Sequence, residues 1–267
     1  SPDKDYFAKQ IDSKNQIALR FTEEEFMGEP IRVLHILQRM EAGGTQALLM
    51  NIYRKIDRTK VQFDFLVVYK EKQFYDDEIE SMGGHVYKLS FREDLNLPKF
   101  QKDLKNLFKQ HHEYQIVHCH AYTIGYFCLK AAKKAGIPVK IAHSHNNETV
   151  HDIKYLPKLF MQRLFTLNAT DLFACSEEAG KYLFKDKPFR VLKNAIDSQQ
   201  FIANENIRRE VRQELGLENK FVVGHVGRLH PQKNHDFLID VFAEIKKKKP
   251  DAELILVGTG PLEEKVR

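Results

Sequence analysis

The 267-residue sequence has few cysteines, no long apolar run and no secretion signal. Its three cysteines (Cys119, Cys128 and Cys175) are an odd number without the spacing of metal ligands, which predicts free thiols in a reducing cytosol. The longest apolar runs have the length of strands, so they exclude a transmembrane helix. The first five residues are polar and contain no signal-peptide core. We therefore expect a cytoplasmic protein.

The net charge of +5 is mild and gives little support to a nucleic-acid partner. The four lysines at 246–249 end a predicted helix, where cations offset the helix dipole. No aromatic residues interleave with them in the pattern that stacks bases. We interpret this run as a solvated helix end and expect no nucleic-acid partner, with nucleic-acid binding left as the weaker alternative.

Strands and helices alternate from residue 31 onward. Residues 1–26 are polar, and Met27 after them resembles a translation start, so we expect 1–26 to be an extension or an expression remnant. Buried-type strands are predicted at 31–37, 63–69, 85–89, 116–120, 139–143, 172–175 and 190–192. Helices are predicted between them at 45–56, 74–81, 97–110, 123–135, 156–167 and 177–184. This alternation predicts an α/β domain over 27–203, with a Rossmann-like parallel sheet wrapped by helices.

A second unit is predicted over 204–267. It has helices at 206–217 and 236–249, strands at 221–226 and 253–257, and the start of another turn at 258–264. Two strands are too few to bury a core. We therefore expect this domain to be truncated in the chain.

The first strand is followed by Gly43-Gly44 and then by a helix. Paired glycines at such a junction let a phosphate or a sugar approach the backbone and the helix N-terminus. A plain tight turn is the competing interpretation. The dinucleotide-binding pattern G-x-G-x-x-G is absent.

Four histidines end two predicted strands: His118 and His120 on one, His143 and His145 on the next. Ligands of parallel α/β sheets lie at the carboxyl ends of the strands, so these four predict a polar pocket. Zinc is the rival interpretation. We disfavour it because side chains alternate between the two faces of a strand, which we expect to separate the rings of an H-x-H run. No cysteine or carboxylate trio completes a site either.

Arg228 and Lys233 flank the turn between a strand and a helix in the second unit. Two cations beside a helix N-terminus suit a diphosphate, and Gly227 keeps side-chain bulk away from the strand end. A surface turn with solvated cations is the alternative. Asn194 lies in the segment between the two units, for which a simple connecting loop is the competing interpretation.

Taken together, these motifs resemble retaining glycosyltransferase family 4. The resemblance rests on Gly43-Gly44, His118-Cys119-His120, the run 191–197 with Phe201, the Gly227-Arg228-x4-Lys233 turn, and 254–263. The run 143–146 (His-Ser-His-Asn) resembles the branch that makes bacterial exopolysaccharide and capsule.

The resemblance implies the GT-B fold, with an acceptor domain at 27–203 and a nucleotide-sugar domain at 204–267. It implies that Arg228 and Lys233 bind the donor diphosphate, that Gly43 and Gly44 approach the donor, and that His120 acts at the reacting centre. It implies transfer with retention, without a metal ion or other cofactor, from a nucleoside-diphosphate sugar for which we expect UDP. His118, His143, His145 and Asn194 are then assigned to the acceptor pocket.

Two departures from the family pattern qualify these expectations. Asn234 stands where the family has glycine, and the chain ends before the family's E-x7-E glutamates. We expect the parent protein to be a transferase and this chain alone to be inactive. A non-catalytic acceptor-binding or assembly module and a nucleotide-sugar epimerase are the alternatives. The helix at 156–165 is amphipathic with two cations; we expect it to pack on the core, with peripheral contact at the inner face of the plasma membrane as the rival interpretation.

Overall fold

The computed structural model describes residues 29–146 and 155–266. The described chain forms two compact units that divide after Ile196, and each is treated by itself. The segment 1–26, expected to be an extension, lies outside the described residues.

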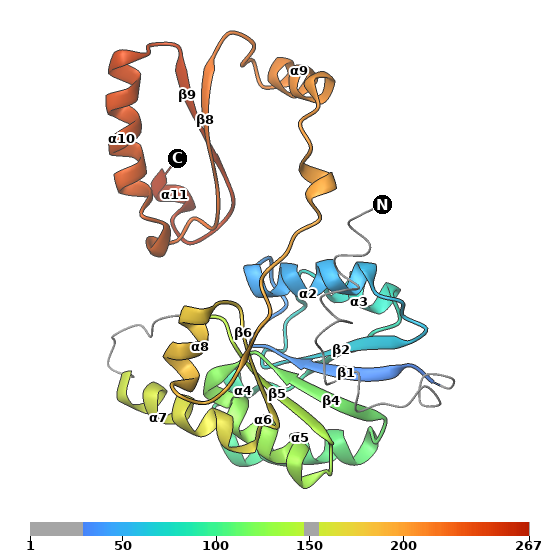
Figure 1. Cartoon of the computed structure of the whole chain (residues 1–267). Coiled ribbons are helices and arrows are strands. Elements are labelled where there is room, and N and C mark those ends of the chain that lie inside the picture. Colours follow the sequence, from blue (N-terminus) through green and yellow to red (C-terminus); the bar gives the residue numbers. More distant parts are fainter. Residues whose placement is uncertain (1–28, 147–154, 267) are drawn as a thin grey trace. The chain divides into compact units, whose positions relative to one another are not determined.

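The first unit contains a seven-stranded parallel sheet with the strand order β3-β2-β1-β4-β5-β6-β7 (Figure 1). Its strands are β1 (Ile31–Ile36), β2 (Val61–Val67), β3 (Val86–Lys88), β4 (Tyr114–Cys119), β5 (Val139–Ser144), β6 (Asp171–Ala174) and β7 (Arg190–Val191). From β1 the chain adds β2 and β3 toward one edge of the sheet, and from β4 it adds β5, β6 and β7 toward the other edge. The switch point at which parallel α/β sheets bind ligands therefore lies between β1 and β4.

Helices cover both faces of this sheet. They are α2 (Gly44–Lys55), α3 (Asp76–Ser81), α4 (Phe91–Asp94), α5 (Leu97–Gln110), α6 (Tyr122–Lys134), α7 (Tyr155–Phe165) and α8 (Glu177–Phe184). Apolar residues of α2 and α3 pack on one face, which we call the α2 face. Those of α5, α6 and α8 pack on the other, which we call the α5 face. The predicted parallel sheet wrapped by helices is confirmed.

The predicted helices at 97–110 and 177–184 match α5 and α8 to the residue. Both begin with a side-chain cap, since Asn96 accepts from Lys99 N (3.0 Å) and Ser176 from Ala179 N (3.1 Å). The sequence prediction missed α4. This helix has only four residues, which are too few to show a helical period. Leu95, which follows it, has a left-handed φ of 47° and ends the helix.

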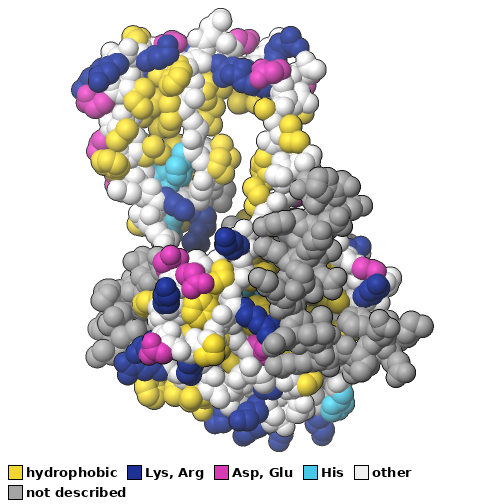
Figure 2. Space-filling model, in the orientation of Figure 1, with side chains coloured by type: hydrophobic (Ala, Val, Ile, Leu, Met, Phe, Trp, Pro, Cys, Tyr) yellow, Lys and Arg dark blue, Asp and Glu magenta, His cyan; other side chains and the backbone are white. Residues whose placement is uncertain are grey.

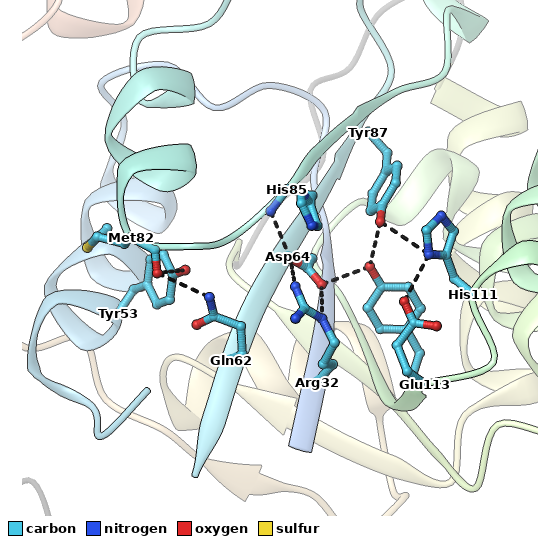
Figure 3. A network of polar contacts seen from close by, with 10 residues as sticks. Arg32, Tyr53, Gln62, Asp64, Met82, His85, Tyr87, His111 and Glu113 are labelled. Carbon is cyan, nitrogen blue, oxygen red and sulfur yellow. Dashed lines mark hydrogen bonds and ion pairs between the residues drawn. The ribbon is translucent and has the colours of Figure 1, made fainter. Parts of the chain in front are cut away.

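A buried polar network joins β1, β2 and β4 on the α5 face of the sheet (Figure 3). Both carboxylate oxygens of Asp64 accept from the Arg32 guanidinium at 2.8 Å. The Tyr114 hydroxyl and the backbone N–H of His85 each donate to the same carboxylate, also at 2.8 Å. Asp64 is fully buried, and this pairing supplies the compensation that a buried charge needs.

The second unit holds a two-stranded parallel sheet, β8 (Phe221–Val226) and β9 (Ala252–Val257). Its helices are α9 (Glu205–Glu214), α10 (His235–Lys248) and α11 (Glu263–Val266). Among its described residues, Leu229 and Ala252 are the buried hydrophobic ones. Ile207, Val211 and Leu215 are 57%, 44% and 55% exposed, and apolar side chains show on the surface of this unit in Figure 2. Two strands bury little here, as expected from their number.

Candidate functional site

Five histidines gather at the carboxyl ends of the three central strands: His35 on β1, His118 and His120 at the end of β4, and His143 and His145 at the end of β5. They extend rows of apolar residues on the α2 face, such as Ile31 and Val33 before His35. The His120 N–H also donates to the carbonyl of Ile36 (2.8 Å), which continues the pairing of β4 with β1 by one residue. The cluster therefore lies at the switch point of the sheet.

The expectation that an H-x-H run separates its two rings is wrong. The rings of His118 and His120 have centroids 4.2 Å apart. Side chains alternate with a period of two along a strand, so residues two apart share a face. The same rule joins His143 and His145, whose centroids are 4.1 Å apart.

Hydrogen bonds between ring nitrogens connect the cluster. His120 contacts His35 through Nε2 (3.2 Å, to Nδ1) and His145 through Nδ1 (2.7 Å, to Nε2). A separate pair joins His118 Nε2 to His143 Nδ1 at 3.0 Å. A neutral imidazole carries one N–H, so His120 donates to one neighbour and accepts from the other. The chain of three rings therefore has two tautomeric arrangements.

Burial keeps these imidazoles uncharged. Desolvation lowers the pKa of His35 to about 3 and that of His145 to about 4. The pKa values of His118, His120 and His143 are held well below 6.5, first by desolvation and then by neighbouring histidines. At neutral pH the cluster offers hydrogen-bond donors and lone pairs without net charge.

Two further features follow the strands that carry the cluster. The Tyr122 hydroxyl accepts from the backbone N–H groups of His145 and Asn146, which fixes the backbone on which His145 stands. Gly43 and Gly44 begin α2 where the chain returns from β1, and no side chain caps this helix. A Cβ on Gly44 would meet no atom within 4 Å. The uncapped first turn of α2 thus has open space beside Gly44, whereas the Gln46 side chain lies close to Gly43. Uncapped backbone N–H groups at a helix start can bind anions.

The turn between β8 and α10 carries Arg228 and Lys233, both exposed. Within the described part of the chain, neither makes an ion pair. Backbone hydrogen bonds hold the turn, from Gly227 N to Val257 O and from Leu229 N to Thr259 O, both 2.9 Å. Among the described residues, therefore, no carboxylate neutralises these two cations, and backbone hydrogen bonds hold the turn that carries them.

Two backbone positions explain residue choices around this turn. A Cβ on Gly258 would lie 2.0 Å from the Gly227 carbonyl oxygen, so only glycine allows the two loops to meet. Asn234, where the family has glycine, has a left-handed φ of 50°. Asparagine tolerates that conformation better than most residues, so this departure leaves the turn intact.

The sequence prediction found four of the five clustered histidines and missed His35. His35 continues the row of core residues Ile31 and Val33 on the α2 face, so no local sequence signal distinguishes it from a core residue. Asn194 is exposed and lies three residues beyond the end of β7. Within the described residues, no hydrogen bond joins its side chain to the histidine cluster. The three cysteines are free, as predicted.

A cavity of 720 Å³ lies elsewhere, between α5 and α6. Lysines of both helices, among them Lys102, Lys105 and Lys134, surround an apolar floor that includes Phe108 and Phe127. None of its lining residues belongs to the histidine cluster or to the Arg228 turn.

A doubly wound parallel sheet with a polar cluster at its switch point defines a Rossmann-like α/β protein. The chain belongs to glycosyltransferase family 4. Residues 42–200 match the model described as Glycosyltransferase Family 4, and residues 207–267 match the one described as Glycosyl transferases group 1. The resemblance seen in the sequence motifs and the expected GT-B class of fold are confirmed.

Known relatives are longer than this chain. EpsF of Bacillus subtilis, which carries a glycosyltransferase name, is 36% identical over 86% of this chain and 62% of its own length. An Escherichia coli enzyme named UDP-Gal:alpha-D-GlcNAc-diphosphoundecaprenol alpha-1,3-galactosyltransferase is 26% identical over 87% of this chain and 63% of its own length. The crystal structure of Anabaena HepE in complex with UDP-glucose superposes with a TM-score of 0.68 at 21% identity, over 88% of this chain and 62% of HepE. None of the described helices combines the length and apolar character needed to cross a membrane.

Proposed function

We propose that the whole protein transfers a sugar, with retention at the anomeric carbon, from a nucleoside-diphosphate sugar to a polysaccharide or a lipid-linked saccharide. Membership of family 4 supports this reaction class. The E. coli relative is named for a UDP-sugar donor and a diphosphoundecaprenol-linked acceptor, and HepE was solved with UDP-glucose. We therefore propose UDP as the nucleotide of the donor.

The observation that supports the proposal most is a pair of exposed cations, Arg228 and Lys233, on a turn held by backbone hydrogen bonds. Neither cation makes an ion pair with another described residue. Negative charge builds on the departing diphosphate as the glycosidic bond breaks. Fixed cations near that charge stabilise the transition state, which is the task that a divalent ion performs in metal-dependent transferases. The second unit is thus the proposed donor domain.

The first unit is the proposed acceptor domain, with His120 at the reacting centre. A charged imidazole would repel the oxocarbenium-like sugar of the transition state. Burial holds the pKa of His120 well below neutrality, so its ring adds no positive charge beside the sugar. To donate to a sugar hydroxyl, His120 would exchange its bond with His35 or with His145 for one to the substrate. Gly43 and Gly44 at the uncapped start of α2 are proposed to approach the donor. His118, His143, His145 and Asn194 are proposed for the acceptor pocket.

Titration of the whole protein with UDP tests the donor assignment. Arg228→Ala should weaken UDP binding about 10- to 100-fold, the loss expected for charge-assisted hydrogen bonds worth about 1.5–3 kcal/mol. Lys247→Ala is the matched control. Lys247 is an exposed cation of the same unit in the last turn of α10, paired with Glu244 at 2.5 Å.

Equal UDP affinity in the Arg228→Ala variant and the wild type would remove Arg228 from the site. Product analysis with a UDP-sugar and a polyprenyl-diphosphate saccharide tests the reaction itself. UDP binding with no transfer to any saccharide acceptor would favour a non-catalytic binding module instead. An epimerised UDP-sugar as the product would favour the epimerase.

A further inference from the structure

Three members of the histidine cluster can bring their ring nitrogens together. One nitrogen each from His120, His143 and His145 lies within 4.8 Å of the other two. Nitrogen ligands bind zinc at about 2.0–2.1 Å in a tetrahedral arrangement, which places them about 3.4 Å from one another. Binding would therefore require His120 Nδ1 and His145 Nε2, now 2.7 Å apart, to separate slightly by rotation about their side-chain bonds, and any pair more than about 3.4 Å apart to approach.

The hydrogen bonds indicate which nitrogens are available. His143 Nε2 is buried and has no partner in the described part of the chain. His120 Nδ1 and His145 Nε2 face each other at 2.7 Å and share one hydrogen. A buried nitrogen without a partner is costly, and a bound ion would satisfy all three atoms at once.

The remaining ring nitrogens already have the partners that metal ligands use. His120 Nε2 contacts His35 Nδ1 at 3.2 Å, and His143 Nδ1 contacts His118 Nε2 at 3.0 Å. A histidine that binds a metal usually directs its other nitrogen to a fixed partner, which sets the tautomer and the ring orientation. His35 and His118 would serve in that outer shell.

We propose that His120 Nδ1, His143 Nε2 and His145 Nε2 form a binding site for a divalent transition-metal ion of the zinc class. Imidazole nitrogens suit Zn²⁺, Co²⁺, Ni²⁺ and Cu²⁺, whereas Mg²⁺, Ca²⁺ and Mn²⁺ prefer oxygen ligands. Three protein ligands leave a fourth position for water or an anionic oxygen.

A second triad, His35, His118 and His120, also meets the distance criterion. All three of its members are buried, at 2%, 7% and 9% exposure, whereas His145 is only partly buried. An ion can therefore reach the first triad from the side of His145. In the second triad, His35 and His118 would themselves bind the ion and could no longer orient the other ligands. The first triad is therefore favoured.

An ion at this site would occupy a lone pair of His120. If His120 acts on the sugar as proposed above, zinc inhibits transfer rather than supporting it. Binding of the ion does not depend on that role, so it is tested by a direct measurement that needs no activity.

Titration of metal-free protein with Co²⁺, followed by displacement with Zn²⁺, tests the site. We expect one Co²⁺ per chain, with the intense visible absorption of a tetrahedral ion. His143→Gln and His145→Gln should each weaken binding at least tenfold, and His35→Phe should weaken it about 10- to 100-fold through the outer shell. His112→Gln, an exposed histidine outside the cluster, is the matched control and should change nothing.

His145 stands at the rim, so His145→Gln keeps the test valid even if His143→Gln fails to fold. Co²⁺ affinity that is unchanged in His145→Gln would overturn the proposal. Weak absorption typical of an octahedral Co²⁺ ion, abolished by His112→Gln, would overturn it as well. Loss of binding on His35→Phe with full binding in His143→Gln and His145→Gln would place the ion on the second triad and overturn this assignment.

Discussion

The central strands carry a polar cluster on each face of the sheet. The two clusters differ in how the desolvation of their buried ionisable groups is compensated. On the α5 face, the Arg32 guanidinium and the Tyr114 hydroxyl donate hydrogen bonds to the buried Asp64 carboxylate and so compensate its burial. On the α2 face, the histidines at the carboxyl ends lose their charge instead, since burial lowers their pKa values.

This difference distinguishes a structural cluster from the candidate functional cluster. Every carboxylate oxygen of Asp64 has a donor from the protein, which leaves little for a ligand to bind. The histidine cluster retains buried nitrogens without partners, His35 Nε2 and His143 Nε2, within the described chain. Groups left unsatisfied at a sheet's switch point are available to a ligand.

The largest expected effect is on the histidine cluster: mild acid should lower the free energy of unfolding by protonating its buried imidazoles. The folded pKa values lie below the unfolded value of about 6.5, at about 3 for His35 and about 4 for His145, so the unfolded state binds more protons between these limits. Stability is therefore complete above pH 6.5 and is lost as pH falls. Each histidine contributes a slope of roughly 1.4 kcal/mol per pH unit, so five together cost several kcal/mol by pH 5.

Urea unfolding of the first unit at pH 7, 6 and 5 measures this slope. His145→Gln should reduce it by about one proton, whereas His112→Gln should leave the contribution of the cluster intact. Aspartate and glutamate titrate mostly below pH 5, so this window isolates the histidines. A urea midpoint that stays level from pH 7 to pH 5 would show that the cluster is charged or exposed in solution.

Removal of the carboxylate should break the other cluster with the next largest effect. Asp64→Ala leaves the Arg32 guanidinium, whose side chain is 21% exposed, without its partner. Breaking a buried ion pair from one side costs about 3–5 kcal/mol. The free energy of unfolding at pH 7 measures the loss. Asp77→Ala removes an exposed carboxylate paired with Lys72 and should have little effect; equal losses in the two variants would contradict a structural role for Asp64.

The sequence predicted the sheet, most of its helices and four of the clustered histidines, because these depend on local periodicity and on strand ends. His118, His120, His143 and His145 each end a recognisable buried strand. His35 was missed because a lone histidine within an apolar strand resembles a core residue until its neighbours are known. The ring-to-ring hydrogen bonds depend on which strands are adjacent, and the placement of β4 beside β1 cannot be read from local patterns.

The Arg32–Asp64–Tyr114 network was not predicted for a related reason. Its members are separated by 32 and 50 residues in sequence and meet only through the order of the strands. The departure at Asn234, by contrast, is explained by the left-handed backbone at that one residue, a conformation that asparagine tolerates. Backbone conformation at one residue is a local property, whereas a cross-strand network is not.

Tyr114→Phe should lower the free energy of unfolding least of the changes considered, and it tests how far Arg32 compensates the buried Asp64 carboxylate without Tyr114. The hydroxyl donates one of the bonds to Asp64, and the carboxylate keeps both Arg32 bonds and the one from His85 N. We expect a loss of about 1.5 kcal/mol in the free energy of unfolding, the low end for a hydrogen bond to a charged group. Tyr126→Phe is the matched control, because that hydroxyl contacts only the exposed Lys130 among the described residues (3.3 Å). A loss as large as that of Asp64→Ala would mean that Arg32 alone does not compensate the buried carboxylate, so that the two faces of the sheet would no longer differ as described.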